Sequence, residues 1–381
     1  MFGNKIRLFK LFGFEVSIDA SWLIIAFLIT WSLAAGVFPF FYPRLSTAAY
    51  WWMGIAGTVG LFMSIVVHEM MHSLVARRYG LPMKGITLFI FGGVAEMSEE
   101  PSSAKAEFSM AVAGPLTSIV AGFVCWLIVL GGQRLSWSLP VLGVVAYLSW
   151  INVILAIFNL VPAFPLDGGR VFRAALWSFT GSYRRASRIA AAFGSGFGLV
   201  LSLLGVLFIF TGALISGIWW ILIGMFLRSA AQMSYQRVVI NSVLRGVPVK
   251  RFMQPRPVTA PAALPVDRLV DDYFYRYHFS MFPVVQDGGR LVGCVRTQDL
   301  KGIARQEWNH HTVNEITHDC SRENSINPDA DAVEALNRMN TTGSTKLLVT
   351  RKEELVGIVT LRDLLGFLSL KLDLEGEDLR K

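Results

Sequence analysis

Residues 60–76 read GLFMSIVVHEMMHSLVA, and this stretch decides how the rest of the chain is interpreted. It places His68, Glu69 and His72 inside an apolar segment that runs from about residue 50 to residue 76. That segment exceeds the ~20 apolar residues with which a helix crosses a bilayer. An ionisable side chain near the centre of such a span costs about 2.5–3.5 kcal/mol. An incidental pair of histidines on a solvated helix therefore does not explain the pattern.

The spacing of the two histidines points to a metal site. Residues four apart lie on one face of a helix, so the imidazoles of His68 and His72 reach the same ion. A zinc site with two histidines needs a third protein ligand and an open position for water, and a neighbouring carboxylate such as Glu69 takes the proton of that water. The sequence predicts one Zn²⁺ per chain, with His68 and His72 as ligands and Glu69 as the catalytic residue.

The candidate for the third ligand is Asp167, in the segment NLVPAFPLDGGR at residues 159–170. Pro162 and Pro165 end the preceding helix, so Asp167 follows on unwound backbone. Zn²⁺, two neutral imidazoles, an ionised Asp167 and hydroxide sum to zero charge, which suits a low-dielectric site. The alternative is an ordinary turn residue, because Asp-Gly is a common turn dipeptide.

Composition supports a membrane protein. The 381 residues are 53% hydrophobic and 16% charged, with a mean hydropathy of +0.49. Soluble proteins carry about 25% charged residues, and disordered chains are poor in apolar residues. Hydropathy predicts about six transmembrane helices, near residues 20–41, 50–76, 107–130, 139–161, 190–211 and 214–233.

The net charge of +8 lies entirely in the first part of the chain. Residues 1–240 hold 16 Lys+Arg and 8 Asp+Glu, whereas residues 241–381 hold 19 of each. Of those 16 basic residues, 14 fall on one predicted side of the membrane and two, Arg44 and Arg134, on the other. This asymmetry predicts that both termini are cytoplasmic. The charge is a topology signal, and it requires no nucleic acid partner.

Two segments read as strands rather than helices. Lys5–Ser17 alternates polar and apolar residues over part of its length, and Lys84–Glu96 is β-branched and aromatic, interrupted by Gly92 and Gly93. The second segment is a candidate hairpin. Strands at membrane depth must be paired and buried in protein, so a small membrane-associated β-sheet beside the helices is expected.

The tail contains an internal repeat. Phe282–Val285 and Leu291–Val295 precede Asp299, and Lys346–Val349 and Leu355–Val359 precede Asp363 in the same pattern. Each copy is expected to fold as helix, strand, turn, strand and helix. Three cysteines, far apart in the sequence, argue against a disulfide framework.

These patterns predict a multi-pass α-helical membrane protein followed by a cytosolic α/β tandem module. The expected domains are a membrane domain at 1–235, a linker at 236–247, repeat copies at 248–306 and 307–371, and a tail at 372–381.

Together the motifs resemble the site-2 proteases, a family of intramembrane zinc metalloproteases, in the subgroup with C-terminal cystathionine-β-synthase (CBS) domains. The resemblance rests on HEMMH at 68–72, on Asn159-x-x-Pro-x-x-Pro-Leu-Asp-Gly, on Gly92-Gly93, and on Ala113-Gly114-Pro115. It implies that His68, His72 and Asp167 are zinc ligands and that Glu69 is the general base and acid. It also implies that Asn159 and the Gly92-Gly93 strand contact substrate or stabilise the oxyanion. The alternative role for Asn159 is a polar contact between helices.

The tail resembles a tandem CBS module, a unit that often binds adenine nucleotides between its copies. The family's Gly-x-x-Thr/Ser-x-x-Asp ending is intact in the second copy, at Gly357, Thr360 and Asp363. In the first copy Arg296 replaces the hydroxyl residue before Asp299. The resemblance implies nucleotide contacts at Thr360, Asp363 and Asp299, and the departure argues against two equivalent sites. The alternative is a module that only forms a homodimer or docks substrate.

The function implied is hydrolysis of peptide bonds in or near the transmembrane segments of other proteins, within a prokaryotic cell membrane. Transcription regulators or their inhibitors are the substrate class that the resemblance implies. Two alternatives stay open: a CBS-regulated metal transporter or channel, and a zinc-binding pseudoprotease. A transport path needs polar residues on several spans. The third, fifth and sixth predicted spans have essentially none in their interiors, apart from Glu107 at an edge.

Overall fold

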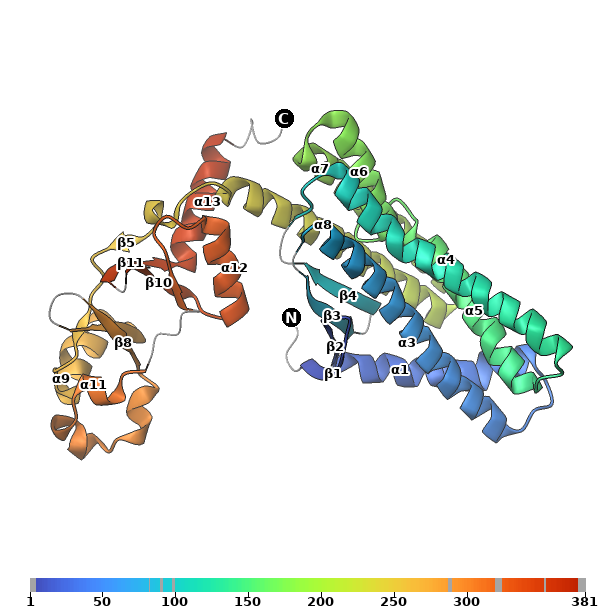
Figure 1. The fold of residues 1–381 in the computed structure, drawn as a ribbon, viewed down its shortest axis with the longest axis horizontal. Helices are drawn as coiled ribbons and strands as arrows, with labels where there is room; N and C mark the ends of the chain where they lie inside the picture. Colours follow the sequence, from blue (N-terminus) through green and yellow to red (C-terminus); the bar gives the residue numbers. More distant parts are fainter. Residues whose placement is uncertain are drawn as a thin grey trace. The chain divides into compact units, whose positions relative to one another are not determined.

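The computed structural model describes residues 5–375 except 82, 90–91, 98–99, 287–289, 319–323 and 353. The chain divides into two compact units, Met1–Gln236 and Arg237–Lys381 (Figure 1). The end of the predicted tail, at 376–381, lies outside the described residues.

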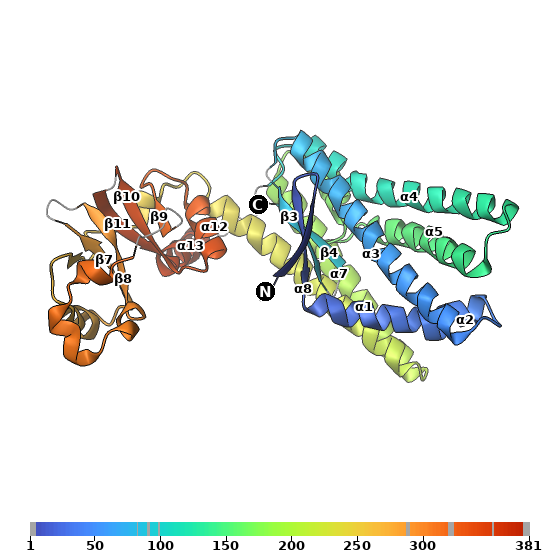
Figure 2. The same ribbon diagram turned by 60° about the horizontal axis from the view of Figure 1, so that its bottom comes forward.

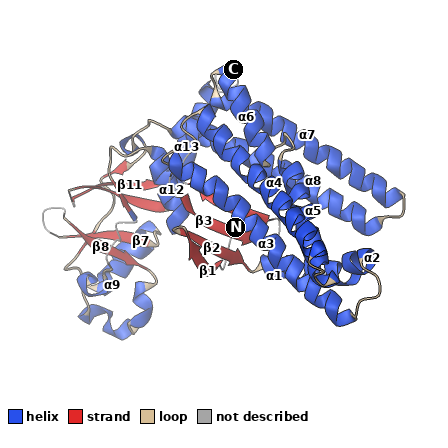
Figure 3. Ribbon diagram, turned by 45° about the vertical axis from the view of Figure 1, so that its right-hand side comes forward, coloured by secondary structure: helices blue, strands red, loops and turns tan. Residues whose placement is uncertain are grey.

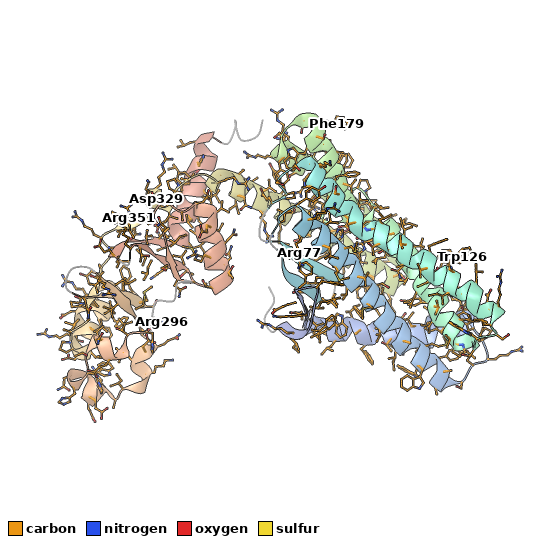
Figure 4. All side chains as sticks on the ribbon, in the orientation of Figure 1. Arg77, Trp126, Phe179, Arg296, Asp329 and Arg351 are labelled. Carbon is orange, nitrogen blue, oxygen red and sulfur yellow. The ribbon has the colours of Figure 1, made fainter. Side chains whose placement is uncertain are left out.

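Helices dominate the first unit. Among the described residues, six helical segments are long and apolar enough to cross a membrane, which confirms the prediction from hydropathy. Large apolar side chains such as Trp126 are exposed on the outside of these helices, as expected where lipid replaces water (Figure 4). The six segments are Ser21–Phe41 (α1, a π-helical turn and α2), α3 Thr47–Arg78, α4 Ala104–Arg134, α5 Leu139–Asn159, α7 Tyr183–Phe210 and α8 Leu214–Leu244.

Local sequence sets where several helices begin. Ser46, Ser103 and Ser182 precede α3, α4 and α7, and each side-chain oxygen accepts a hydrogen bond from the backbone N–H three residues later. Such caps satisfy an N–H group that the first helical turn leaves unpaired. The shorter helix α6, Asp167–Thr180, ends at Gly181, whose φ of +64° is a left-handed conformation that glycine adopts without steric cost.

Helices α3 and α5 pack in parallel through small residues. A Cβ on Gly57 would lie 3.3 Å from the Tyr147 ring, and one on Gly60 would lie 2.6 Å from Leu148. Further along both helices, the Asn152 amide donates to Ser64 at 2.9 Å. Small residues let helix backbones approach closely where no hydrophobic effect drives them together.

A four-stranded sheet lies beside α1 and α3 (Figure 3). The first predicted strand segment is itself a hairpin, because Phe12 and Gly13, with φ values of +48° and +86°, form a tight turn inside it. Val16, Ile18 and Leu88 of this sheet pack on α3 in one buried cluster. In spatial order the strands are β1 Lys5–Leu11, β2 Phe14–Asp19, β3 Met83–Phe89 and β4 Gly92–Met97.

The second unit confirms the repeat. In copy one, Val284 pairs with Gly293, and in copy two, Val349 pairs with Gly357. In each hairpin the pairing register shifts at the following residue, so the two copies have the same register and an irregularity at the same position. One sheet contains β6 Ala260–Pro261, β7 Met281–Val285 and β8 Leu291–Arg296. The other contains β5 Gln254–Pro255, β11 Glu354–Thr360, β10 Lys346–Arg351 and β9 Ser325–Ile326.

Short helices flank these two sheets. They are α9 Val266–Leu269, α10 Tyr275–Tyr277, α11 Val313–Ile316, α12 Ala332–Thr342 and α13 Leu361–Glu375.

The end of α8 belongs to the core of the second copy. Helix α8 runs without interruption to Leu244 (Figure 2). Leu244, Val249 and Phe252 lie in the same buried cluster as residues of β10, β11 and α12. Strand β5 also pairs with β11, although it lies within the range predicted for the first copy, 248–306. The end of α8 and the beginning of the range predicted for the first copy therefore pack into the second copy.

One expectation about cysteines is wrong. Cys125 is free, but Cys294 is disulfide-bonded. Strand β8, which carries Cys294, is bridged to His318 by two backbone hydrogen bonds. Distance along the sequence therefore does not predict which cysteines lie close together in the fold.

Candidate metal centre

Three potential ligands converge on one point. His68 and His72 lie one turn apart on α3, and each is 3% exposed. Their Nε2 atoms are 3.0 and 3.2 Å from Oδ2 of Asp167, and 3.2 Å from each other. The ligand atoms of all three side chains lie within 4.8 Å of one another. Two nitrogens and a carboxylate oxygen form a donor set that suits zinc.

The neighbouring groups hold both imidazoles in the orientation that a metal requires. His72 Nδ1 lies 2.6 Å from the carbonyl oxygen of Met110, which only accepts, so this nitrogen carries the proton. His68 Nδ1 lies 2.8 Å from the buried hydroxyl of Ser118. A neutral imidazole protonated on Nδ1 keeps its lone pair on Nε2. The lone pair on Nε2 of His72 therefore points toward Asp167. The same is true of His68 Nε2 when His68 Nδ1 donates to Ser118.

A glycine of α4 leaves the space beside these atoms open. A Cβ on Gly114 would lie 2.2 Å from His72 Nε2 and 2.6 Å from His68 Nε2. Any larger residue would therefore occupy the position at which the two nitrogens meet. The residues fit a zinc ion in donor type, in orientation and in space.

The loop before α6 presents Asp167 to the histidines. Helix α5 ends at Asn159, and the chain folds back so tightly that a Cβ on Gly168 would lie 2.3 Å from the carbonyl oxygen of Leu160. Asp167 is the first residue of α6, where a negative charge is favourable. The turn therefore holds Asp167 with its side chain directed at the two histidines.

Glu69 lies next to the last strand of the sheet. A Cβ on Gly93 would lie 2.9 Å from Glu69 Cγ, so β4 passes in contact with this side chain. Gly92 begins β4, opposite Phe89. Among the described strands of this sheet, β4 has a neighbour on one side only. No other strand among the described residues pairs with its second edge.

Asn159 lies near the level of the histidines. Asn152 faces Ser64, which is one turn before His68. Because seven residues make about two turns, Asn159 lies on the same face of α5 as Asn152. Its side chain is half-buried and makes no hydrogen bond with the other described residues. The structure thus brings His68, His72 and Asp167 together, with Glu69 and Gly93 beside them. Among the described residues, no hydrogen bond joins Asn159 to these groups.

Comparisons with known proteins identify the family of this chain. The model of peptidase family M50 matches residues 56–136 and 132–204. "Putative zinc metalloprotease Rip3" of Mycobacterium tuberculosis is 35% identical over 363 residues, which cover 94% of this chain and 92% of Rip3. The chain belongs to peptidase family M50. The "Putative zinc metalloprotease sll0528" of Synechocystis is 32% identical to this M50 peptidase over 358 residues, 93% of each chain.

The second unit of this M50 peptidase is a CBS pair, because the CBS domain model matches residues 249–304 and 313–370. Among solved structures, a site-2 protease from Methanocaldococcus jannaschii is 29% identical to it. That likeness covers 61% of this chain and 95% of the other, with a TM-score of 0.43.

The proposed nucleotide-contacting residues of the CBS pair are engaged in helix capping. The Asp363 carboxylate accepts from Thr360 N–H at 2.9 Å, and Thr360 Oγ1 lies 3.2 Å from Asp363 N, a reciprocal capping box at the start of α13. In copy one, Asp299 accepts from Arg296 N–H at 2.7 Å, but Arg296 has no hydroxyl to complete the box (Figure 4). A 3₁₀ turn of four residues follows there, in contrast to the 15 residues of α13.

We expect Gly114→Ala in this M50 peptidase to weaken zinc binding strongly, because the added methyl group displaces both imidazoles from their meeting point. Gly131→Ala is the matched control, since it lies on the same helix and a Cβ there meets nothing within 4 Å. Zinc content after dialysis against a chelator measures both variants. Equal zinc content in Gly114→Ala and wild type would show that this space is not part of the site.

Proposed function

We propose that this chain is an intramembrane zinc metallopeptidase that hydrolyses peptide bonds in or near the transmembrane segments of its substrates. The observation that carries the proposal is the convergence of His68, His72 and Asp167 beside Glu69, on a helix apolar enough to cross a membrane. The orientation of His72 by a backbone carbonyl, and the open space at Gly114, support the same assignment.

His68, His72 and Asp167 would hold the zinc ion. When bound, zinc would lower the pKa of a water molecule and polarise the carbonyl of the scissile peptide bond. The Glu69 carboxylate accepts the proton of the attacking water and returns it to the leaving amide nitrogen. The Met110 carbonyl and the Ser118 hydroxyl keep the imidazoles in place during these transfers. The Asn159 amide N–H is a donor for the developing oxyanion, and a fall in kcat of Asn159→Ala tests that role.

Substrate binding is proposed at the free edge of β4. A transmembrane helix satisfies its backbone hydrogen bonds internally, so its peptide bonds are hidden until it unwinds locally. An unwound segment finds new partners by adding as a strand to β4, which runs beside Glu69. The substrate class that fits is a membrane-embedded protein, and a transcription regulator or its inhibitor is our candidate.

The two alternative functions require different arrangements of residues. A transporter needs polar or ionisable groups along a path through several helices. In the part of the chain that the structure describes, His68, His72 and Asp167 are the one group of three side chains arranged to hold a metal. This favours a site that holds one bound ion over a path along which ions cross the membrane. A pseudoprotease needs the same three ligands, so turnover separates it from the proposed enzyme.

The test uses the full chain, purified in detergent, with a peptide that contains one transmembrane segment. We expect about one zinc per chain, cleavage of the peptide, loss of cleavage with 1,10-phenanthroline and recovery on addition of zinc. Retention of zinc without cleavage of any membrane protein would favour the pseudoprotease. Zinc flux into vesicles that contain the protein would favour the transporter.

We further propose that both termini and the CBS pair lie in the cytoplasm, where the pair regulates the peptidase by binding an adenine nucleotide or by forming a homodimer. The family's ending is intact only in the second copy, at Thr360 and Asp363, so that copy is our candidate for the nucleotide site. Calorimetry of the full chain with ATP, ADP and AMP tests binding. Absence of heat with all three would leave the homodimer, which sedimentation measures.

A further inference from the structure

A buried ion pair connects two helices of the metal centre. The side chains of Glu107 on α4 and Arg173 on α6 are 0% and 5% exposed. Arg173 Nε donates to Glu107 Oε1 at 2.7 Å, and Nη2 donates to the same oxygen. Glu107 was expected at the edge of a span, and it does lie in the first turn of α4, but its side chain is fully enclosed.

The guanidinium of Arg173 also contacts α7 and the loop before α6. Its carbon lies 4.7 Å from the ring centres of both Phe164 and Tyr183, and Nη1 donates to Ser187 at 3.5 Å. Phe164 belongs to the loop before α6, and the other two residues begin α7. One side chain thus joins α4, α6, α7 and the loop that leads into Asp167.

The two helices that the pair joins carry different parts of the metal centre. Glu107 lies one turn before Met110, whose carbonyl orients His72. Arg173 lies on the helix that Asp167 begins. The pair therefore fixes the helix that supplies the third ligand against the helix that orients the histidines.

The backbone at Phe164 is packed closely against two glycines. A Cβ on Gly169 would lie 2.5 Å from Phe164 N, and a Cβ on Gly194 would lie 2.3 Å from Phe164 O. With the ring of Phe164 against Arg173, the loop has little freedom three residues before Asp167.

Stability alone does not account for this pair. Removing two charges from water is costly, and replacing a buried ion pair by well-packed apolar residues is often neutral or stabilising. One oxygen, Glu107 Oε2, has no hydrogen-bond partner at all among the described residues. A pair that is expensive to bury and incompletely satisfied is better explained by the geometry that it imposes.

We propose that Glu107 and Arg173 are positioning residues that hold Asp167 at the histidines and thereby set the affinity for zinc. This inference rests on the proposed function, because it assumes that zinc binds to His68, His72 and Asp167. Outer groups that orient metal ligands typically change metal affinity by about 10–100-fold when they are removed.

The test compares three variants of the full chain in detergent. Glu107→Met with Arg173→Met removes both charges at once, so that neither is left buried and unpaired. Arg173→Lys keeps the charge but loses the planar contacts with Phe164 and Tyr183. Arg78→Met, at the exposed end of α3, is the matched control for loss of an arginine.

Zinc affinity is measured by competition with a chromogenic chelator, and the melting temperature of the metal-free protein reports folding. We expect about 10–100-fold weaker zinc binding in the double variant and in Arg173→Lys, with the double variant melting within a few degrees of wild type. Arg78→Met should bind zinc as wild type does.

Wild-type zinc affinity in either Arg173→Lys or the folded double variant would overturn the positioning role. A wild-type protein that binds no zinc would instead overturn the proposed function itself. If the double variant does not fold, the affinity of Arg173→Lys decides the matter.

Discussion

Glu69→Gln is expected to retain zinc and to lose about 10²–10⁴-fold in kcat for cleavage of a transmembrane peptide. Glutamine has nearly the same shape, so its contact with Gly93 of β4 persists. An amide does not accept a proton from water at neutral pH, so the base is lost while the three ligands stay. Metal analysis and single-turnover cleavage of the same preparation measure both effects.

The matched control is Glu334→Gln in α12, an exposed glutamate paired with Arg338, which should cleave as wild type does. Unchanged turnover in Glu69→Gln would remove Glu69 from the chemistry. In cells, single-pass proteins that are cut with wild type and uncut with Glu69→Gln are the natural substrates.

Asp167→Ala is expected to reduce zinc affinity by more than the 10–100-fold typical of outer groups, because it removes a ligand atom itself. The Oδ2 atom is 3.0 Å from His68 Nε2 and 3.2 Å from His72 Nε2, and no other acidic side chain of the described residues joins this group. Zinc competition with a chelator measures the change, and cleavage should fall with occupancy.

Asp329→Ala is the control, because Asp329 is an exposed aspartate that pairs with Lys250 and Arg351 (Figure 4). Full zinc occupancy in Asp167→Ala would return Asp167 to the role of an ordinary turn residue. A large fall in the melting temperature of the metal-free variant would show damage to the fold, so both quantities are compared.

Much of the site follows from local patterns. HEMMH at residues 68–72 places two imidazoles on one helix face because the α-helix has a fixed repeat. The spans follow from their apolar length, and the repeat of the tail follows from its hydrophobic pattern. The same reasoning correctly placed Glu107 at the edge of a span, but a linear pattern does not show that its side chain is buried against Arg173 of another helix.

The turn at Phe12 and Gly13 is a smaller example. Alternation over Lys5–Ser17 indicates extended chain, but it does not show that the chain reverses in the middle. The reversal depends on two left-handed residues, of which one is a phenylalanine that rarely adopts this conformation.

The sequence by itself determined that this chain crosses a membrane, carries paired histidines beside a glutamate, and ends in a repeated α/β module. Each is a property of neighbouring residues. Only the tertiary structure decided that Asp167, 99 residues from His68, reaches the same point, and that Gly114 leaves that point open. Only the tertiary structure shows that Glu107 and Arg173, which lie on different helices, form an ion pair. These contacts depend on how helices pack against one another, and that packing is a property of the whole fold.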